Sequence, residues 1–400
     1  MALKGKRNRR IETGDMKEDR ISELPDCLLH HIFSFADTTD AVKTCTLSKR
    51  WRYLWTSLPF LKLSYKSFSK INVNFINQVL MRRNSVPITS FYFSSPFQVK
   101  ASAVEPWICY AINHQVQHLT IELNCPASPV EFPNCFYSCT SLTTLKLDAY
   151  DFGLMLPKTL GLSSLKNLHL VSFRIEDFDG SIFSSCPNLK TLKLEDVWFE
   201  GMEGFCVCAL NLKSFEFVQP EEPDIYGPCE FVIVAPKLRK FKFYGYPPFV
   251  CSSENLSSLD QLEIDLPSSV ELDCTYYTDE LKQELALEVL QMLDAFHMAK
   301  SITLSMNVLQ VLSYISSSLN QHPSEFLNLE YLKFESRESS GKVKIPGFIL
   351  NYFLKSSPLL EICCTFILSP PSRRMLAARH ACISTLLPQE LFFFLECTSD

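Results

Sequence analysis

Pairs of cysteine and histidine residues are the groups in this 400-residue chain that could bind a metal ion. The close pairs among its 16 cysteines and 8 histidines are Cys135/Cys139, Cys206/Cys208, Cys363/Cys364 and His30/His31. A structural zinc site needs two ligand pairs at regular short spacing such as Cys-x-x-Cys, which these pairs lack. Neighbouring His30 and His31 would lie on different faces of a helix, so they could not chelate one ion. We therefore expect buried cysteines and no metal.

Catalytic signatures are also missing from the sequence. It contains no Gly-x-x-x-x-Gly-Lys-Ser/Thr phosphate loop, no Gly-x-Ser-x-Gly nucleophile elbow and no His-Glu-x-x-His zinc motif. Only 11 glycines are available for turns that cradle phosphate groups. The sequence therefore predicts a protein that is not an enzyme and that needs no cofactor.

The charge is unevenly distributed along the chain. Residues 1–20 carry seven Lys/Arg and four Asp/Glu, a net charge of +3. Because the whole chain has a net charge of −6, the remaining residues carry −9. An acidic body argues against the broad basic surface that binding to a nucleic-acid backbone requires, although a local basic patch stays open. We therefore expect no nucleic-acid partner.

Compartment signals are few. No secretory apolar region follows the basic start, and no apolar run approaches the roughly 20 residues that span a bilayer, so we expect no membrane contact and a reducing environment. Five basic residues between Lys4 and Arg10 fit either a nuclear-import signal or a solvated tail. The expected location is the nucleus, the cytoplasm or both.

A repeated pattern must position any functional residues in the rest of the chain. Leu-x-x-Leu-x-Leu, with Phe, Ile or Val allowed, occurs eight times, and the first seven copies start 26, 23, 24, 23, 26 and 21 residues apart. That spacing is typical of leucine-rich repeats. The copies are Val116/Leu119/Ile121, Leu142/Leu145/Leu147, Leu165/Leu168/Leu170, Leu189/Leu192/Leu194, Leu212/Phe215/Phe217, Leu238/Phe241/Phe243, Leu259/Leu262/Ile264 and Leu329/Leu332/Phe334. A weaker copy at Ile88/Phe91/Phe93 could begin the series.

Each copy predicts a short strand that buries its fourth and sixth positions, while the position between them faces outward. One repeat cannot bury its own apolar face, so stacked repeats form a curved solenoid with a parallel sheet on one side. Asn124 alone fits the usual turn asparagine, and apolar pairs such as Phe173/Ile175 take its place elsewhere. The expected fold class is therefore α/β, with an irregular repeat solenoid.

The outward positions form a row of mixed charge. They are Thr120, Lys146, His169, Lys193, Glu216, Lys242, Glu263 and Lys333, with Tyr244 two residues after Lys242. On the middle and later repeats we expect the substrate-binding surface to comprise Lys193, Glu216, Lys242, Tyr244 and Glu263. The alternative is that lysine and glutamate on neighbouring strands only pair weakly and keep the sheet soluble.

Helical spacing appears later in the chain. Leu281, Leu285, Val289, Met292 and Phe296 predict a helix of about five turns, with Thr278 or Asp279 as its N-cap. A strand copy at Ile302/Leu304 follows, and the apolar residues from Val308 to Leu319 predict a second helix.

The segment before the repeats predicts three short helices. Leu28, Leu29, Ile32 and Phe33 form one apolar stripe after Pro25. A residue between Asp37 and Asp40 can cap the second helix, and Ser48 can cap a third that carries Trp51 and Trp55. So small a unit cannot bury all these side chains itself, so some should face a partner or the neighbouring repeats. A simple N-terminal cap for the solenoid is the alternative.

This segment resembles the F-box family. The matching residues are Leu24-Pro25, the Leu28/Leu29/Ile32/Phe33 stripe, Ala41-Val42, Leu47-Ser48 and Lys49-Arg50-Trp51-Arg52-x-Leu54-Trp55. The resemblance implies binding to the Skp-type adaptor of a cullin-RING (SCF-type) ubiquitin ligase, with the remainder capturing an unknown protein substrate. By the same resemblance the adaptor-facing residues are Leu24, Pro25, Leu28, Ile32, Phe33, Val42 and Trp51.

The whole chain resembles the plant group that combines an F-box, irregular leucine-rich repeats and an FBD region. Residues 326–367 are similar to the first half of FBD, and its second half is missing. The expected parts are a basic tail (1–18), the F-box (19–62), a helical linker with a possible first repeat (63–115), repeats (116–325), the FBD-like region (326–367) and an unassigned segment (368–400). A repeat scaffold or ligand-dependent receptor outside a ligase remains the alternative.

Overall fold

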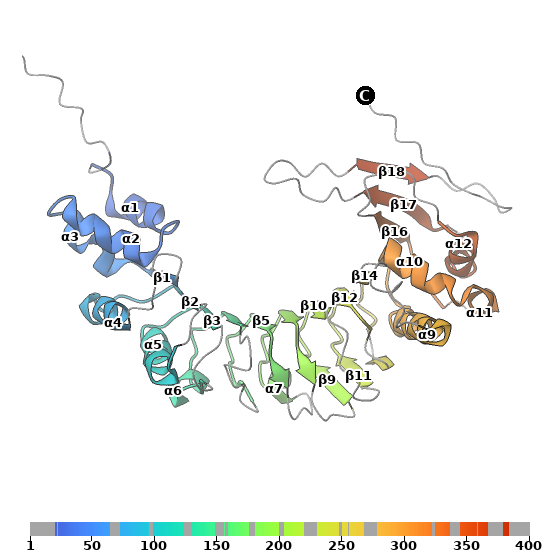
Figure 1. Cartoon of the computed structure of the whole chain (residues 1–400), viewed down its shortest axis with the longest axis horizontal. Helices are drawn as coiled ribbons and strands as arrows, with labels where there is room; N and C mark the ends of the chain where they lie inside the picture. The colour runs from blue at the N-terminus through green and yellow to red at the C-terminus, as the bar shows by residue number, and fades with distance from the viewer. Residues whose placement is uncertain are drawn as a thin grey trace, which may run out of the picture.

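The long sheet gives the molecule the shape of an arc. The computed structural model describes residues 21, 23–64, 73–95, 99–123, 130–148, 156, 159–175, 181–199, 204–219, 230–247, 250–254, 256–267, 278–321, 325–336, 345–357, 359–366 and 379–383. The strands of the long sheet line the inner side of the arc, and the helices of the repeats lie on its outer side (Figure 1). The predicted α/β class and solenoid architecture are confirmed.

The inner sheet has 13 strands, and all neighbouring pairs are parallel except the last. Its order is β1 (Phe60–Ser64), β2 (Ser90–Ser95), β3 (His118–Leu123), β4 (Thr144–Asp148), β5 (Asn167–Val171), β7 (Thr191–Glu195), β10 (Ser214–Gln219), β12 (Lys240–Gly245), β14 (Gln261–Asp265), β15 (Ser301–Ser305), β16 (Tyr331–Ser336), β17 (Glu361–Phe366) and β18 (Arg379–Ile383). Both ends differ from the expected series. The sheet begins at β1, inside the predicted F-box, and an antiparallel β18 lies in the segment left unassigned.

The outer side changes along the chain. Helices α4 (Val73–Arg82), α5 (Ala101–Asn113), α6 (Asn134–Tyr137) and α7 (Ser181–Ser184) come first. Two small parallel sheets follow, β6 (Arg174–Ile175) with β8 (Trp198–Phe199) and β9 (Gly204–Cys208) with β11 (Glu230–Val234) and β13 (Val250–Glu254). The last repeats use α9 (Asp279–Ala295), α10 (Met306–Ser313), α11 (Ser316–Gln321) and α12 (Gly347–Leu354). The irregularity expected from the sequence is therefore mainly a change in what covers the sheet.

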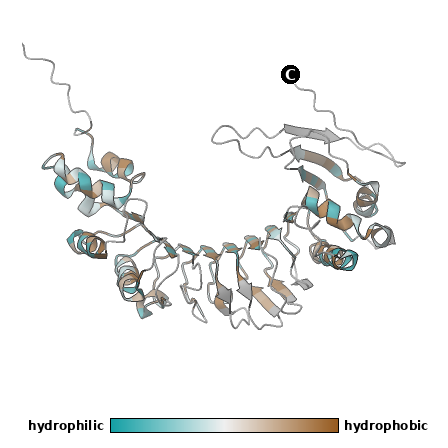
Figure 2. Cartoon of the chain, in the orientation of Figure 1, coloured by the Kyte–Doolittle hydropathy of each residue, from teal (hydrophilic) through white to brown (hydrophobic). Residues whose placement is uncertain are grey.

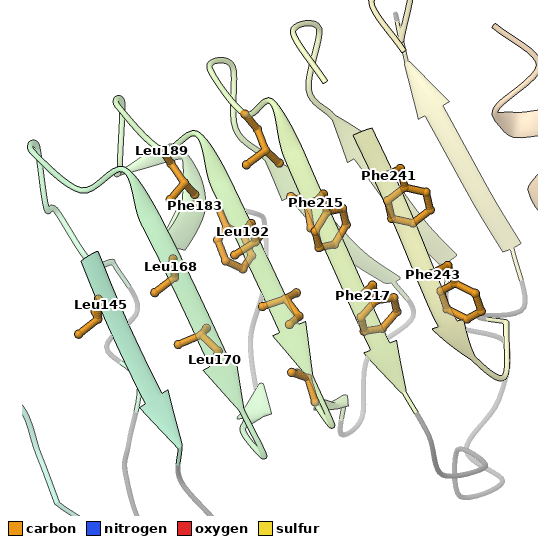
Figure 3. Packing of buried hydrophobic residues seen from close by; sticks show 14 of the residues in the cluster. Leu145, Leu168, Leu170, Phe183, Leu189, Leu192, Phe215, Phe217, Phe241 and Phe243 are labelled. Carbon is orange, nitrogen blue, oxygen red and sulfur yellow. The ribbon is translucent and has the colours of Figure 1, made fainter. Parts of the chain in front are cut away.

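Two rows of apolar side chains form the core. Leu145, Leu168, Leu192, Phe215 and Phe241 lie opposite one another in register, and a second row two residues later includes Leu170, Phe217 and Phe243. All these side chains are buried on the outer side of the sheet (Figure 3). The ring centroids of Phe215 and Phe241 lie 5.3 Å apart, so the predicted row of buried side chains continues as packed aromatic rings.

The turns use two devices in place of the usual asparagine. After the strands, Phe173 and Val197 are buried, as the sequence predicted, while Asn124 lies outside the described residues. Before the strands, the Asn188 and Asn211 amides each donate a 2.8 Å hydrogen bond to a carbonyl of the preceding repeat, at Ser163 and Pro187. These bonds satisfy turn carbonyls that would otherwise lack a partner.

The helix predictions near residue 280 hold with one difference. Helix α9 begins at Asp279, and the Thr278 hydroxyl accepts a 3.3 Å hydrogen bond from the Leu281 N–H as its N-cap. The expected second helix is two helices, because α10 ends at Ser313 and α11 begins at Ser316. Ile315, between them, is buried, so the break lets the chain turn while its apolar face stays covered.

Candidate functional site

The F-box segment forms a small helical unit joined to the sheet. It consists of α1 (Asp26–Phe33), α2 (Thr38–Lys43) and α3 (Trp51–Leu54), with single 3-10 turns after α2 and α3. Phe33 and Trp51 meet edge to face at 5.6 Å, and Leu29 is buried beside the rest of the core. These side chains hold the unit together, so the rest of α1 is free to present other residues.

Hydrogen bonds attach this unit to β1. The Thr38 hydroxyl accepts a 2.8 Å hydrogen bond from the Lys62 N–H, and the Ser64 hydroxyl donates to both carboxylate oxygens of Asp37 at 2.8 and 2.9 Å. Asp37 occupies the N-cap position of α2, but its side chain makes no cap hydrogen bond. The predicted cap residue therefore serves as a clamp on the first strand.

The structure divides the seven predicted adaptor-facing residues into three groups. Leu28 and Ile32, each 48% exposed, lie one turn apart on α1, and Pro25 just before them is exposed. Leu24 and Val42 are half-buried, whereas Phe33 and Trp51 are buried within the unit. In this conformation, Leu28 and Ile32 are available for direct contact with a partner. Phe33 and Trp51 pack against each other in the interior of the unit and stabilise it.

Sequence reasoning missed two further exposed apolar residues of the same unit. Phe35 is 77% exposed and Leu47 is 68% exposed. Phe35 continues the Leu28 and Ile32 spacing by one more turn, which is the signal that could have identified it. Helix α1 is drawn largely in the colour of hydrophobic residues (Figure 2). We call Leu28, Ile32, Phe35 and Leu47 the apolar strip.

The predicted substrate-binding residues lie together on the inner face. Four of them lie opposite one another in register on β7, β10, β12 and β14: Lys193, Glu216, Lys242 and Glu263. Tyr244 lies two residues after Lys242 on β12 and is paired with Val218 and Asp265. All five side chains are half-buried. The strand register therefore brings together the residues that the repeat pattern selected.

Most of these charges are already paired. Lys193 contacts Glu195 at 3.1 Å and Glu216 at 3.2 Å, and Lys242 contacts Glu263 at 2.5 Å. The same pattern recurs nearer the ends of the sheet at Lys146–Glu122 and Lys333–Glu335. Each partly exposed pair contributes about 0–1 kcal/mol to stability. The alternative reading, a solvated and self-neutralising face, therefore holds for much of the row.

Protonation in the central pairs follows from competing effects. Burial acts to raise the pKa of Glu195, but Lys193 and His169 outweigh it and the pKa is lowered. Burial acts to lower the pKa of Lys193, but Glu195 and Glu216 outweigh it and the pKa is raised. For His169, burial prevails over Glu195 and lowers the pKa. Lys193 and Glu195 are therefore ionised at neutral pH, with a neutral imidazole beside them.

The cysteines in the described part of the chain do not gather around a metal site. Among the described residues, no group of three or more His, Cys, Asp or Glu side chains could hold an ion. Cys109 and Cys135 approach each other with sulfurs 3.5 Å apart, and burial together with Cys109 raises the pKa of Cys135 to about 11. That thiol is protonated at neutral pH and is a poor nucleophile. Cys139, Cys186 and Cys364 are buried, as the sequence predicted, but Cys27 is exposed and the other described cysteines are half-buried.

None of the helices in the described part of the chain has the length and apolar character that crossing a lipid bilayer requires.

Comparisons with known proteins agree with this geometry. Residues 21–63 match the F-box domain model, and residues 104–245 match the model for LRR repeats of FBD-associated F-box protein At5g56370. The F-box match covers the helical unit and β1, and the second match covers the sheet from α5 to the end of β12. The FBD-like assignment of residues 326–367 stays a prediction, and its described parts form β16, α12 and β17.

Several curated proteins of Arabidopsis thaliana are similar over most of the chain. Putative F-box/LRR-repeat protein At5g02930 is 30% identical, over 83% of this chain and 69% of the relative. F-box/LRR-repeat protein At4g14103 is 28% identical, over 86% and 90%, and F-box/FBD/LRR-repeat protein At1g78750 is 26% identical, over 87% and 77%. With an F-box unit fused to a repeat sheet and relatives of the same layout, this chain belongs to the family of F-box/LRR-repeat proteins.

Proposed function

We propose that this protein is the substrate-recognition subunit of a cullin-RING ubiquitin ligase. The F-box would bind a Skp-type adaptor, the adaptor would connect it to a cullin, and the solenoid would hold the protein to be ubiquitinated. An F-box domain implies a Skp-type adaptor as a partner in general. The cullin and the protein substrate are proposed from the pairing of an F-box with a repeat solenoid in one chain.

The apolar strip is the observation that carries the proposal. Its four side chains are exposed on a unit whose interior is already filled by Leu29, Phe33 and Trp51. Several exposed apolar residues on one small unit mark a contact surface, because their transfer from water onto a partner is favourable. A cap for the solenoid would have turned them toward β1, whereas the attachment to β1 uses Thr38 and Asp37.

The first prediction tests adaptor binding. Leu28→Asp or Ile32→Asp should reduce affinity for a Skp-type adaptor by about 2 kcal/mol or more, because each places an unpaired charge in a contact that excludes water. Titration of the purified chain with adaptor measures the effect. Both residues are half exposed, so the variants should remain folded.

A matched control is Leu359→Asp, which makes the same change at a leucine that is 91% exposed near the far end of the sheet. It should bind adaptor like the wild type. Full adaptor binding by both strip variants would remove the ligase reading and leave a repeat scaffold that acts outside a ligase.

A second prediction concerns the substrate surface. Tyr244 is the best single anchor among the five predicted residues, because tyrosine can bury a large apolar area and still form a hydrogen bond. Tyr244→Ala should remove most substrate proteins from affinity purifications in which the ligase is inhibited, while adaptor recovery stays the same. Tyr331→Ala, at a half-exposed tyrosine on β16, is the control. An unchanged substrate profile for Tyr244→Ala would place recognition elsewhere.

A further inference from the structure

Six cations form an exposed row at the edge of the inner sheet where the strands begin. Four of them directly precede a strand: Lys166 precedes β5, Lys190 precedes β7, Lys213 precedes β10 and Arg239 precedes β12. The other two, Lys237 and Lys240, lie within two residues of Arg239. All six side chains are exposed. We call this set the basic ridge; it is separate from the half-buried row of Lys193 and Lys242.

Backbone hydrogen bonds hold the basic ridge in register. The Lys190 N–H donates to the Lys166 carbonyl at 2.8 Å, the Lys213 N–H to the Lys190 carbonyl at 2.8 Å and the Arg239 N–H to the Lys213 carbonyl at 2.9 Å. Neighbouring parallel strands lie about 4.8 Å apart, so these four backbone positions span roughly 14 Å. The backbone positions of the four cations are therefore directly adjacent on successive strands.

The ridge cations differ from Lys146, Lys193, Lys242 and Lys333 in lacking acidic partners. Within the described part of the chain, none of the six forms an ion pair; the nearest contact is a 2.6 Å hydrogen bond from Lys237 to the Asn211 side chain. The row ends at Asp260, which pairs with Lys300 on the next strand. Like charges directly opposite on neighbouring strands are destabilising. An acidic partner molecule would remove the repulsion between the ridge cations. Four other lysines of the sheet already have acidic neighbours within the chain: Lys146, Lys193, Lys242 and Lys333.

We propose that the basic ridge binds an acidic, extended segment of the protein that the solenoid captures. An extended peptide advances about 3.3 Å per residue, so four or five residues would follow the span of the ridge. The proposal deepens the proposed function and rests on it, because it names the substrate class that the same inner face would select. A segment on the ridge would leave the rest of the substrate free to reach Tyr244 across the sheet.

The surroundings favour an acidic protein segment over a nucleic acid. The opposite edge of the inner face carries Glu122, Asp148, Glu195, Asp265 and Glu335, two residues beyond the central row. These carboxylates would repel a phosphate backbone laid across the face. The residues that directly follow Lys166, Lys190 and Lys213 are Asn167, Thr191 and Ser214, so none of the three offers an aromatic side chain for stacking bases.

Labelled probes bound to the purified complex of the full chain with its adaptor test the proposal. The probes are a peptide that alternates glutamate with serine, the same peptide with glutamine in place of glutamate, and a single-stranded oligothymidine. Fluorescence anisotropy should show binding of the glutamate peptide that weakens with added salt, and clearly weaker binding of the glutamine peptide. Lys190→Glu with Lys213→Glu should weaken the glutamate peptide by about tenfold or more, because attraction becomes repulsion at two adjacent strands.

Arg82→Glu with Lys100→Glu is the matched control, since it makes the same charge change at exposed residues on earlier repeats. It should bind the glutamate peptide like the wild type. If the ridge double variant fails to fold, Lys190→Gln with Lys213→Gln replaces it with the same expected direction. Equal binding by the wild type and the ridge variant, or equal binding of the glutamate and glutamine peptides, would overturn the proposal.

Two further outcomes separate the ligands and the functions. Tighter binding of oligothymidine than of the glutamate peptide, lost in the ridge variant, would overturn the proposal in favour of a nucleic-acid site. Adaptor titration of the same protein reports on the ligase role independently, because the apolar strip lies in the F-box unit and not on the ridge. A chain that binds adaptor but not the glutamate peptide would refute only the ridge proposal.

Discussion

Replacing Leu168 or Leu192 with aspartate is expected to unfold or aggregate the repeats. Both side chains belong to the buried row on the outer side of the sheet, with at most 2% of their surface exposed. Burying a carboxylate there without a partner, together with the loss of the leucine packing, should exceed about 4 kcal/mol. Each repeat depends on its neighbours, so damage at β5 or β7 should spread along the sheet. Denaturant melts measure the loss.

Lys146→Ala and Lys193→Ala are the controls on the opposite face of the same strands or their neighbours. Each removes ion pairs made by a side chain that is 34% or 30% exposed, so the expected loss is about 0–1 kcal/mol. Similar destabilisation by the aspartate and alanine variants would mean that the assignment of buried and exposed faces is wrong.

Gly245→Ala should strongly destabilise the solenoid. Gly245 ends β12 opposite Gln219 with a φ of +137°, and a Cβ there would lie 1.9 Å from the Gln219 carbonyl oxygen. A side chain at this φ is strained by about 1–3 kcal/mol, and overpacking adds typically about 1–3 kcal/mol. The close approach is between two backbones, so a side-chain rotation cannot relieve it. The midpoint of denaturant unfolding should fall accordingly.

Gly347→Ala is the matched control. Gly347 begins α12, and a Cβ there would meet nothing within 4 Å. The change should leave stability unaltered or raise it by about 0.4–1 kcal/mol, since alanine restricts the unfolded chain. A Gly245→Ala protein as stable as Gly347→Ala would show that β10 and β12 can separate at this end without cost.

The sequence predicted the core rows because period-2 alternation directly reports burial. It also held a signal that was not used: Leu58, Leu61 and Leu63 repeat the motif spacing and correspond to β1. That copy overlaps the segment that resembles the F-box. The F-box resemblance accounts for those residues without requiring a strand there. The antiparallel β18 carries no comparable periodic signal, and pairing across a sheet end depends on tertiary contacts.

The functional surfaces were only partly predictable. An apolar helical stripe identifies Leu28 and Phe33 equally, and only the packing against Trp51 shows which of them is buried. The second position of four successive repeat copies is Lys or Arg, at Lys166, Lys190, Lys213 and Arg239, so the basic ridge was visible in the sequence. Its significance was not, because alternation separates faces of a sheet but cannot show which cations lack an acidic partner.

The attachment of α2 to β1 has a practical consequence for studying the two halves apart. The outermost strand of any sheet offers unpaired backbone groups to which a second molecule can add. Here the Thr38 hydroxyl occupies the Lys62 N–H on that side. Expression of the solenoid without the F-box would uncover β1, or β2 if β1 were also removed, and would invite end-to-end association between copies. Retention of residues 23–64 in a truncated protein, with Leu28 and Ile32 changed to polar residues, would silence the adaptor contact and keep the sheet edge protected.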